Sequence, residues 1–312
     1  MVPTTPPGGP CRGRRTPGHT GRMTYVSVGV DGSESSTRAL QWAVREGALR
    51  GAPVRAVLAW GYLDQHRATA GGDFDPSYGE GDALEALDAF VLEAVGPEAA
   101  EDIERVAVCA LPAPGLLEAA AGDPLLVVGA RGRGGFKGLL LGSVSQQVLH
   151  HATGPVAIVR PDGLTRSEDT MERIVVGIDG SEVSRRALRW AIAEAGMRGA
   201  TLDVVHSWHM PYVGGYPYAG VPFDTASFES EAQQLLDEAV DSEDTTALPE
   251  PAHRILVLGS PAQVILETAK GADLVVMGSR GLGGFKGLLL GSASHQVAQH
   301  AGCPVVIVPP ES

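Results

Sequence analysis

The two halves of the chain have the same pattern, in which short apolar runs alternate with amphipathic segments. The runs are typical of buried strands in a parallel sheet, and the segments between them repeat their apolar positions with helical spacing. Strands that alternate with helices predict a doubly wound α/β fold with a parallel sheet in each half. The first half has its runs at 25–30, 54–59, 103–109, 125–128 and 156–159, and the second at 173–178, 202–207, 254–258, 274–277 and 305–308.

A glycine-rich stretch follows the fourth apolar run of each half. The spacing Gly-x2-Gly-x9-Gly-Ser runs from Gly129 to Ser143 and again from Gly278 to Ser292, and residues 134–143 are identical to 283–292. Glycines allow sharp turns and close approach to a ligand, and the free amides at a helix start attract anions. A connector that only needs tight turns is the alternative, but the retention of the spacing in both copies favours phosphate binding. The stretch matches neither the P-loop pattern nor Gly-x-Gly-x-x-Gly.

An aspartate follows the first apolar run of each half. Asp31 and Asp179 are each followed by Gly-Ser-Glu and then by apolar residues with helical spacing. Ser33 or Ser36 and Ser181 or Ser184 are candidate N-caps of these helices. A turn or capping role is the simple interpretation of each aspartate. The alternative is contact with a ligand, because open α/β sheets bind ligands at the carboxyl ends of their strands.

Composition divides the chain into an N-terminal extension and two domains. Residues 1–22 are rich in Pro, Gly and Arg and contain no acidic residue, so we expect them to be disordered. We expect a first domain at 23–161, a polar linker at 162–170 and a second domain at 171–310. Apolar residues make up 44% of the chain and charged residues 20%, which is typical of globular domains. Irregular loops are expected at 61–81 and 209–227.

Charge and hydropathy exclude several classes of partner. The net charge of −13 argues against nucleic acid, although local backbone amides can still bind a small anion. No apolar run reaches the roughly 20 residues that a membrane helix needs. The first 22 residues also lack the apolar core of a secretory signal. We therefore expect a cytoplasmic protein with no membrane partner.

On its glycine spacing after strand four and its aspartate after strand one, the chain resembles the ATP-binding branch of the universal stress protein family. The resemblance covers both halves, from about Tyr25 to Pro309, and identifies the chain as a tandem member. It implies a five-stranded parallel sheet in each half, in the order 3-2-1-4-5 with helices on both faces. It also implies that the fifth strands pair antiparallel. This would make the chain an intramolecular pseudo-dimer that can form a homodimer.

The resemblance also implies an adenine nucleotide at the carboxyl edge of each sheet. Asp31 and Asp179 would hold the ribose or the adenine side, and Ala59 and Ser207 would meet the adenine through backbone groups. ATP would be the cofactor, with Mg or Mn held by its phosphates and no metal site made by the protein alone. The phosphate-binding residues would be Gly129, Arg131, Gly132, Arg133, Gly142, Ser143, Val144 and Ser145 in the first half, with Gly278, Arg280, Gly281, Gly291, Ser292, Ala293 and Ser294 in the second.

No catalytic constellation repeats in the two halves. His206 and His295 lie near the expected sites, but Leu58 and Gln146 occupy the equivalent positions of the first half. A duplicated active site should keep its acid or base in both copies. We therefore expect a regulator or sensor in stress response, not an enzyme, acting on an unidentified protein partner through two ATP sites. A slow ATP hydrolase or a nucleotidyl transferase of the same broad fold is the alternative.

The first half departs from the family pattern beside its expected site. Ala110-Leu111 occupies the position of Gly259-Ser260, and Asp123-Pro124 that of Ala272-Asp273. A bulkier turn would make the first site tighter or weaker if it borders the pocket. The glycine spacing itself is intact, so two sites are expected.

Overall fold

A computed structural model describes residues 23–61, 78–133, 140–161, 173–209, 225–282 and 290–311 of the chain. Strands and helices alternate along both halves. The first half contains β1 (Val26–Gly29), α1 (Glu34–Arg50), β2 (Val54–Trp60), α3 (Glu80–Glu101), β3 (Ile103–Cys109), α4 (Pro112–Ala119), β4 (Leu125–Gly129), α5 (Ser143–His151) and β5 (Val156–Val159). The second half contains β6 (Arg173–Ile178), α6 (Glu182–Arg198), β7 (Thr201–Trp208), α7 (Thr225–Asp241), β8 (His253–Leu258), α8 (Pro261–Thr268), β9 (Leu274–Gly278), α9 (Ser292–His300) and β10 (Val305–Val308).

The strands form one continuous ten-stranded sheet. Its order is β3-β2-β1-β4-β5-β10-β9-β6-β7-β8, so each half has the predicted order 3-2-1-4-5 and the second half mirrors the first. Pairing within each half is parallel; Val28, for example, lies between Ala56 of β2 and Val127 of β4. The predicted fold class is therefore confirmed.

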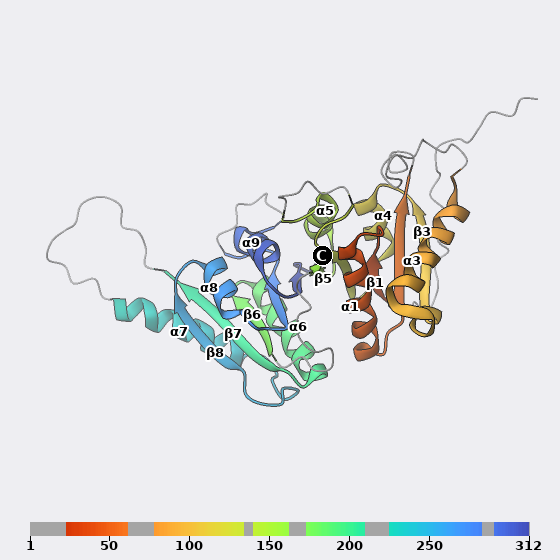
Figure 1. The fold of residues 1–312 in the computed structure, drawn as a ribbon. Coiled ribbons are helices and arrows are strands. Elements are labelled where there is room, and N and C mark those ends of the chain that lie inside the picture. The colour runs from red at the N-terminus through yellow and green to blue at the C-terminus, as the bar shows by residue number, and fades with distance from the viewer. Residues whose placement is uncertain are drawn as a thin grey trace, which may run out of the picture.

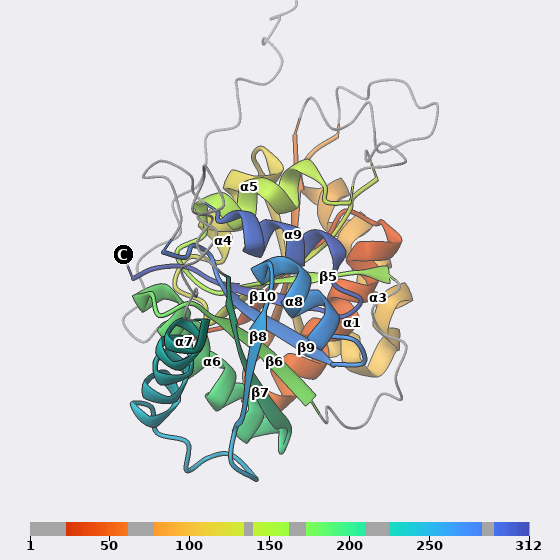
Figure 2. The same ribbon diagram turned by 90° about the vertical axis from the view of Figure 1, so that its left-hand side faces the viewer.

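The two halves join through their fifth strands. β5 and β10 pair antiparallel, with Val306 opposite Ala157 and Ile307 opposite Val156. Both strands are fully buried and lie near the centre of the molecule (Figure 2). The antiparallel pairing expected from the resemblance is thus present within one chain, and neither apolar strand is a bare sheet edge.

In the described part of the chain, helices from both halves cover each face of the sheet (Figure 1). One apolar core joins α1, α3, α6 and α7 to the sheet and includes Trp42, Leu87, Leu188 and Leu236. The other core joins α4, α5, α8 and α9 and includes Leu116, Val148, Ile265 and Val297. Both cores extend across the seam between the halves, so burial of apolar surface links the halves as well as stabilising each of them.

Local sequence signals set the ends of the long helices. Ser33 and Ser181 are the N-caps of α1 and α6, and each hydroxyl oxygen accepts a hydrogen bond from the backbone N–H three residues later. Both helices end at a glycine in the left-handed region, Gly51 with φ 58° and Gly199 with φ 62°. Glycine adopts this conformation without the steric cost of a side chain.

Two buried glutamates and two partly buried arginines connect α1 and α6 across the seam. Arg50 contacts Glu46 on its own helix at 3.3 Å and Glu194 on α6 at 2.5 Å. Arg198 contacts both Glu194 and Glu46. Glu46 is fully buried and Glu194 is 1% exposed. The halves are thus held by an ion network as well as by the strand pair.

Some boundaries differ from the sequence-based expectations. The regular part of α3 ends at Val95, because Gly96 has φ 80° and ψ 169°, and Pro97 then begins a further turn that α3 includes. α7 begins at Thr225, inside the segment 209–227 that was expected to be an irregular loop. The expected disorder of 1–22, the linker 162–170 and most of both long loops lie outside the described residues. No helix in the described ranges is long and apolar enough to cross a bilayer.

Candidate functional site

The predicted site residues gather at the carboxyl edge of each half of the sheet. β1 and β4 are parallel neighbours, so Asp31, two residues beyond the end of β1, lies beside the turn that begins at Gly129. β6 and β9 place Asp179 beside the turn at Gly278 in the same way. The centre of each glycine-rich stretch, 134–139 and 283–289, lies outside the described residues.

The aspartate carboxylates fix the start of each glycine-rich loop. Asp31 Oδ1 accepts the N–H of Ser33 at 3.0 Å, and Oδ2 accepts the N–H of Arg133 at 3.0 Å. Asp179 repeats both contacts, with Ser181 at 3.1 Å and Leu282 at 2.7 Å. Each carboxylate therefore accepts a hydrogen bond from the turn after its own strand and another from the loop after the neighbouring strand, and so connects the two.

The glycines that face these carboxylates have no room for a side chain. A Cβ on Gly132 would lie 2.3 Å from Asp31 Oδ2, and a Cβ on Gly281 would lie 2.1 Å from Asp179 Oδ2. A Cβ on Gly129 would lie 2.8 Å from the backbone of Ser35 at the start of α1. The first two glycines of the motif are thus explained by packing of the protein against itself.

The last glycine of the motif is different. Gly142 is the N-cap of α5 and Gly291 the N-cap of α9, with backbone angles that any residue can adopt. A Cβ at either position would meet its nearest neighbour at 3.5 Å, an ordinary contact. Neither helix has a side-chain hydrogen bond at its N-cap within the described residues. Neither backbone conformation nor packing of the described residues requires glycine here.

The hydroxyl groups of two predicted site serines donate hydrogen bonds to the backbone at the start of each loop. Ser145 Oγ donates to the carbonyl oxygen of Gly129 at 2.7 Å, and Ser294 Oγ donates to that of Gly278 at 2.6 Å. Both serines are 4% exposed. Their side chains therefore hold the loop against its helix, and only their backbone amides belong to the helix N-terminus. Ser143, Val144, Ser292 and Ala293 lie in the same first turns.

The expected adenine side lies at the ends of β2 and β7. Ala59 and Ser207 are the next-to-last residues of these strands, where the adenine contact implied by the resemblance requires them to be. Beside Ala59, the ring of Trp60 meets that of Tyr78 edge to face, with centroids 6.0 Å apart. Burial, followed by the charge of Asp82, raises the pKa of the Tyr78 hydroxyl. Sequence reasoning missed this aromatic pair, although Trp60 and its equivalent Trp208 were visible at matching positions.

Histidines near the sites have structural contacts. His206 is 8% exposed, and its Nδ1 lies 2.9 Å from the carbonyl oxygen of Ile178. His295 contacts the side-chain amide of Gln299 on the next turn of α9. Burial, together with the charges of His151 and His295, lowers the pKa of His150. His206 and His295 thus each contact a neighbouring group of the fold.

A buried hydroxyl near the second loop was not anticipated. Ser279, between Gly278 and Arg280, is 2% exposed, and its Oγ has no hydrogen-bond partner among the described residues. It lines a narrow crevice at the seam that has no room for a water molecule, with Leu149 and Val156 from the first half. Ala130 occupies the equivalent position in the first half, so the two loops are not identical in their described parts.

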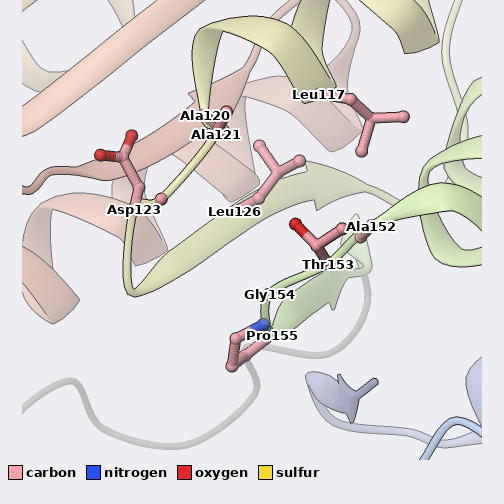
Figure 3. A pocket seen from close by; sticks show the side chains of 10 residues that line it. Leu117, Ala120, Ala121, Asp123, Leu126, Ala152, Thr153, Gly154 and Pro155 are labelled. Atoms are coloured by element: carbon pink, nitrogen blue, oxygen red, sulfur yellow. The ribbon is translucent and has the colours of Figure 1, made fainter. Parts of the chain in front are cut away.

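A pocket in the described part of the chain lies away from the predicted sites. Its volume is about 200 Å³, and Figure 3 shows Asp123, Leu126, Thr153 and Pro155 around it. Leu126 belongs to the amino end of β4, and Pro155 directly precedes β5. This edge of the sheet is opposite to the glycine-rich loops. The Asp123 carboxylate is occupied there, because it accepts from the Ser27 hydroxyl at 2.6 Å and from the backbone N–H of Tyr25.

Comparisons with known proteins all identify the same family. The sequence model of the Universal stress protein family matches residues 23–160 and 170–309. A universal stress protein of Mycolicibacterium smegmatis is 34% identical over 292 residues, which cover 91% of this chain and 97% of that protein. Universal stress protein Rv2005c of Mycobacterium tuberculosis is 32% identical over 289 residues, covering 90% and 96%.

Solved structures support the same fold. The crystal structure of a universal stress protein from Archaeoglobus fulgidus has a TM-score of 0.62 and 22% identity, and the match covers 91% of this chain and 98% of that one. A putative universal stress protein from Pseudomonas aeruginosa has a TM-score of 0.61 at 16% identity, covering 92% and 93%. With the family model matched in both halves and relatives that align over nine-tenths of its length, the chain belongs to the universal stress protein family as a member with two tandem domains.

Proposed function

We propose that the chain is a regulator of the ATP-binding branch of its family, with one ATP site in each half. Bound ATP would change a surface that another protein contacts. One observation carries the proposal. Gly142 and Gly291 stand at helix N-termini where the described residues leave room for a side chain. Absence of a side chain at these two positions leaves space for an anion to approach the helix amides.

The other residues of each loop support the same interpretation. Asp31 and Asp179 hold the loop backbone in place before any ligand arrives, which reduces the ordering cost of binding. Arg131 and Arg280 add a positive charge beside each loop. Within the described ranges no three His, Cys, Asp or Glu side chains gather to hold a metal ion. We therefore assign Mg or Mn, where it accompanies ATP, to the phosphates.

The proposal is tested by replacing each N-cap glycine with aspartate. Gly142→Asp and Gly291→Asp would place a carboxylate at the helix amides, in the space assigned to a phosphate. After bound nucleotide is stripped, calorimetric titration of the parent chain should give two equivalents of ATP. Each single variant should give one equivalent and the double variant none, with unchanged circular dichroism. A parent chain that binds clearly less than one equivalent of ATP would contradict the proposal.

Turnover measured on the same samples separates a regulator from an enzyme. A regulator needs no multiple turnover, since ATP shifts a conformation only by binding one form better than the other. Hydrolysis at about 1 per second or faster, in the range of ordinary enzymes, would replace the regulator with the hydrolase alternative.

A further inference from the structure

The two loops differ in one charged side chain directly after their second glycine. Arg133 follows Gly132, whereas Leu282 follows Gly281. Both residues donate their backbone N–H to the facing aspartate. The two side chains therefore start from equivalent places beside the candidate phosphate sites, and one carries a positive charge where the other is apolar.

The Arg133 side chain turns back over the loop after β1. A Cβ on Gly32 would lie 2.4 Å from Arg133 Nη2 and 2.8 Å from its Cζ. The guanidinium is therefore packed against the turn that follows Asp31, and Gly32, at φ 76°, leaves the space it needs. Its position is thus at the carboxyl edge of the sheet, beside the helix start of α1.

The second half fills the same space with apolar groups. A Cβ on Gly180, which is equivalent to Gly32, would meet Leu235 of α7 at 2.9 Å. Leu282 is 72% exposed. The described part of the first site thus carries the guanidinium groups of Arg131 and Arg133. That of the second carries only Arg280, and each site has one facing aspartate.

We propose that Arg133 makes the first site selective for the number of phosphates on its ligand, whereas the second site discriminates much less. This inference rests on the proposed nucleotide sites. A guanidinium binds phosphate oxygens through paired N–H groups and attracts a triphosphate more strongly than a monophosphate. One additional charge within about 5 Å of a phosphate, at the effective dielectric of a protein surface, changes an affinity by about tenfold or more.

The test measures one site at a time. Gly291→Asp blocks the second site and leaves the first to be titrated; Gly142→Asp does the reverse. ATP, ADP and AMP are titrated into each stripped full-length chain. We expect the ratio of ATP to AMP affinity to be about tenfold larger at the first site. Because exposed charges are screened by salt, this excess should shrink as ionic strength rises.

Exchange of the two residues completes the experiment. Arg133→Leu in the Gly291→Asp chain should lower the ATP to AMP ratio about tenfold, and Arg133→Lys should retain part of it. Leu282→Arg in the Gly142→Asp chain should raise the ratio. Leu282 is exposed, so this change is not expected to disturb folding. If the ratio of ATP to AMP affinity were equal at both sites and did not change with Arg133→Leu or Leu282→Arg, the role of Arg133 would be overturned while the proposed function would stand. Absence of nucleotide binding in every chain, including the parent, would overturn the proposed function with it.

Discussion

The Asp179 carboxylate occupies the space that a side chain on Gly281 would need, and its Oδ2 would lie 2.1 Å from such a Cβ. The same oxygen accepts the N–H of Leu282 at 2.7 Å. Asp31 and Gly132 repeat this relationship in the first half, at 2.3 Å. Aspartate and glycine, more than 100 positions apart, are thus two parts of one contact. The glycine is required so that the carboxylate can reach the loop backbone.

This relationship predicts strong coupling between the two positions. Gly281→Ala should displace the carboxylate and break its bond to Leu282, at a cost of about 1 to 2 kcal/mol in the free energy of unfolding. In an Asp179→Ala background the same methyl has space, so the second substitution should cost little. A double-mutant cycle by urea unfolding measures the difference. Additive effects of the two changes would contradict the contact. Gly302→Ala, where a Cβ meets nothing within 4 Å, is the control.

Replacement of the N-cap glycines should affect stability and binding in opposite directions. Asp is preferred over Gly at an N-cap and also interacts favourably with the helix dipole. Gly142→Asp and Gly291→Asp should therefore stabilise the nucleotide-free chain by roughly 0.5 kcal/mol each. The parent chain should gain about 2.7 kcal/mol for each of its two sites, or about 5.4 kcal/mol in all, when ATP exceeds its dissociation constant a hundredfold, and the double variant should gain nothing. Thermal unfolding with and without ATP checks both expectations. A double variant that is still stabilised by ATP would contradict the assignment of these glycines.

Sequence reasoning predicted the strands and the glycine-rich loops because these depend on local patterns, and the family resemblance supplied the strand order. Apolar runs, helical spacing and the duplicated glycines are each visible within a short window. Contacts between distant residues were not visible in this way. The motif indicated Gly132 and Gly281 as glycines that face phosphate, whereas the structure shows that Asp31 and Asp179 already require them. A loss of ATP binding after Gly132→Glu would therefore not distinguish a ligand contact from a damaged loop.

The ion network between the halves was also beyond sequence reasoning. Glu46 and Arg50, like Glu194 and Arg198, are four residues apart on a helix, which is the usual spacing of an exposed ion pair. Nothing in that spacing indicates that the two pairs meet and become buried. Their burial depends on the antiparallel pairing of β5 with β10, which brings α1 and α6 together.

Separation of the halves should expose the strands that join them. Residues 23–161 alone would leave β5 without its partner, and residues 171–310 alone would leave β10 bare. An apolar edge strand without charges recruits another strand. Each half should therefore dimerise or aggregate when expressed alone, and co-expression should give a one-to-one complex. Light scattering after size-exclusion chromatography measures the masses. A monodisperse monomer of either half would count against a required strand pair.

Removal of one arginine from the network should destabilise the whole chain. Arg198 contacts both buried carboxylates, Glu46 and Glu194. Arg198→Ala would leave the two buried carboxylates with Arg50 as their one remaining partner, at a cost of up to about 3 to 5 kcal/mol, the range for breaking a buried ion pair. Arg189→Ala is the matched control on the same helix, because Arg189 is half-exposed and pairs with Glu182 and Glu243. Pairs made by an exposed arginine contribute about 0 to 1 kcal/mol each. Equal losses of unfolding free energy in the two variants would show that the network is not effectively buried.

Glu46 should make the stability of the chain depend on pH. Burial raises the pKa of the Glu46 carboxyl from its ordinary 4.5 to about 7; the charge of Arg198 opposes this shift and that of Glu194 adds to it. Between about pH 4.5 and 7 the folded chain therefore keeps a proton that the unfolded chain has released. Unfolding then releases a proton, so the contribution of Glu46 to the free energy of unfolding falls as the pH rises through this window and is level above it.

Glu46→Gln isolates this contribution, because glutamine resembles the protonated carboxyl and does not titrate. Urea unfolding of both chains at pH 5, 6, 7 and 8 should show the parent losing stability relative to the variant up to about pH 7, and no further change beyond it. Glu182→Gln is the control: a hydrogen bond from Arg189 lowers the pKa of Glu182, so its effect should be constant over this range. If Arg50 and Arg198 instead outweighed burial, the pKa of Glu46 would fall below 4.5, and the parent and the Glu46→Gln chain would differ by a constant amount from pH 5 to 8.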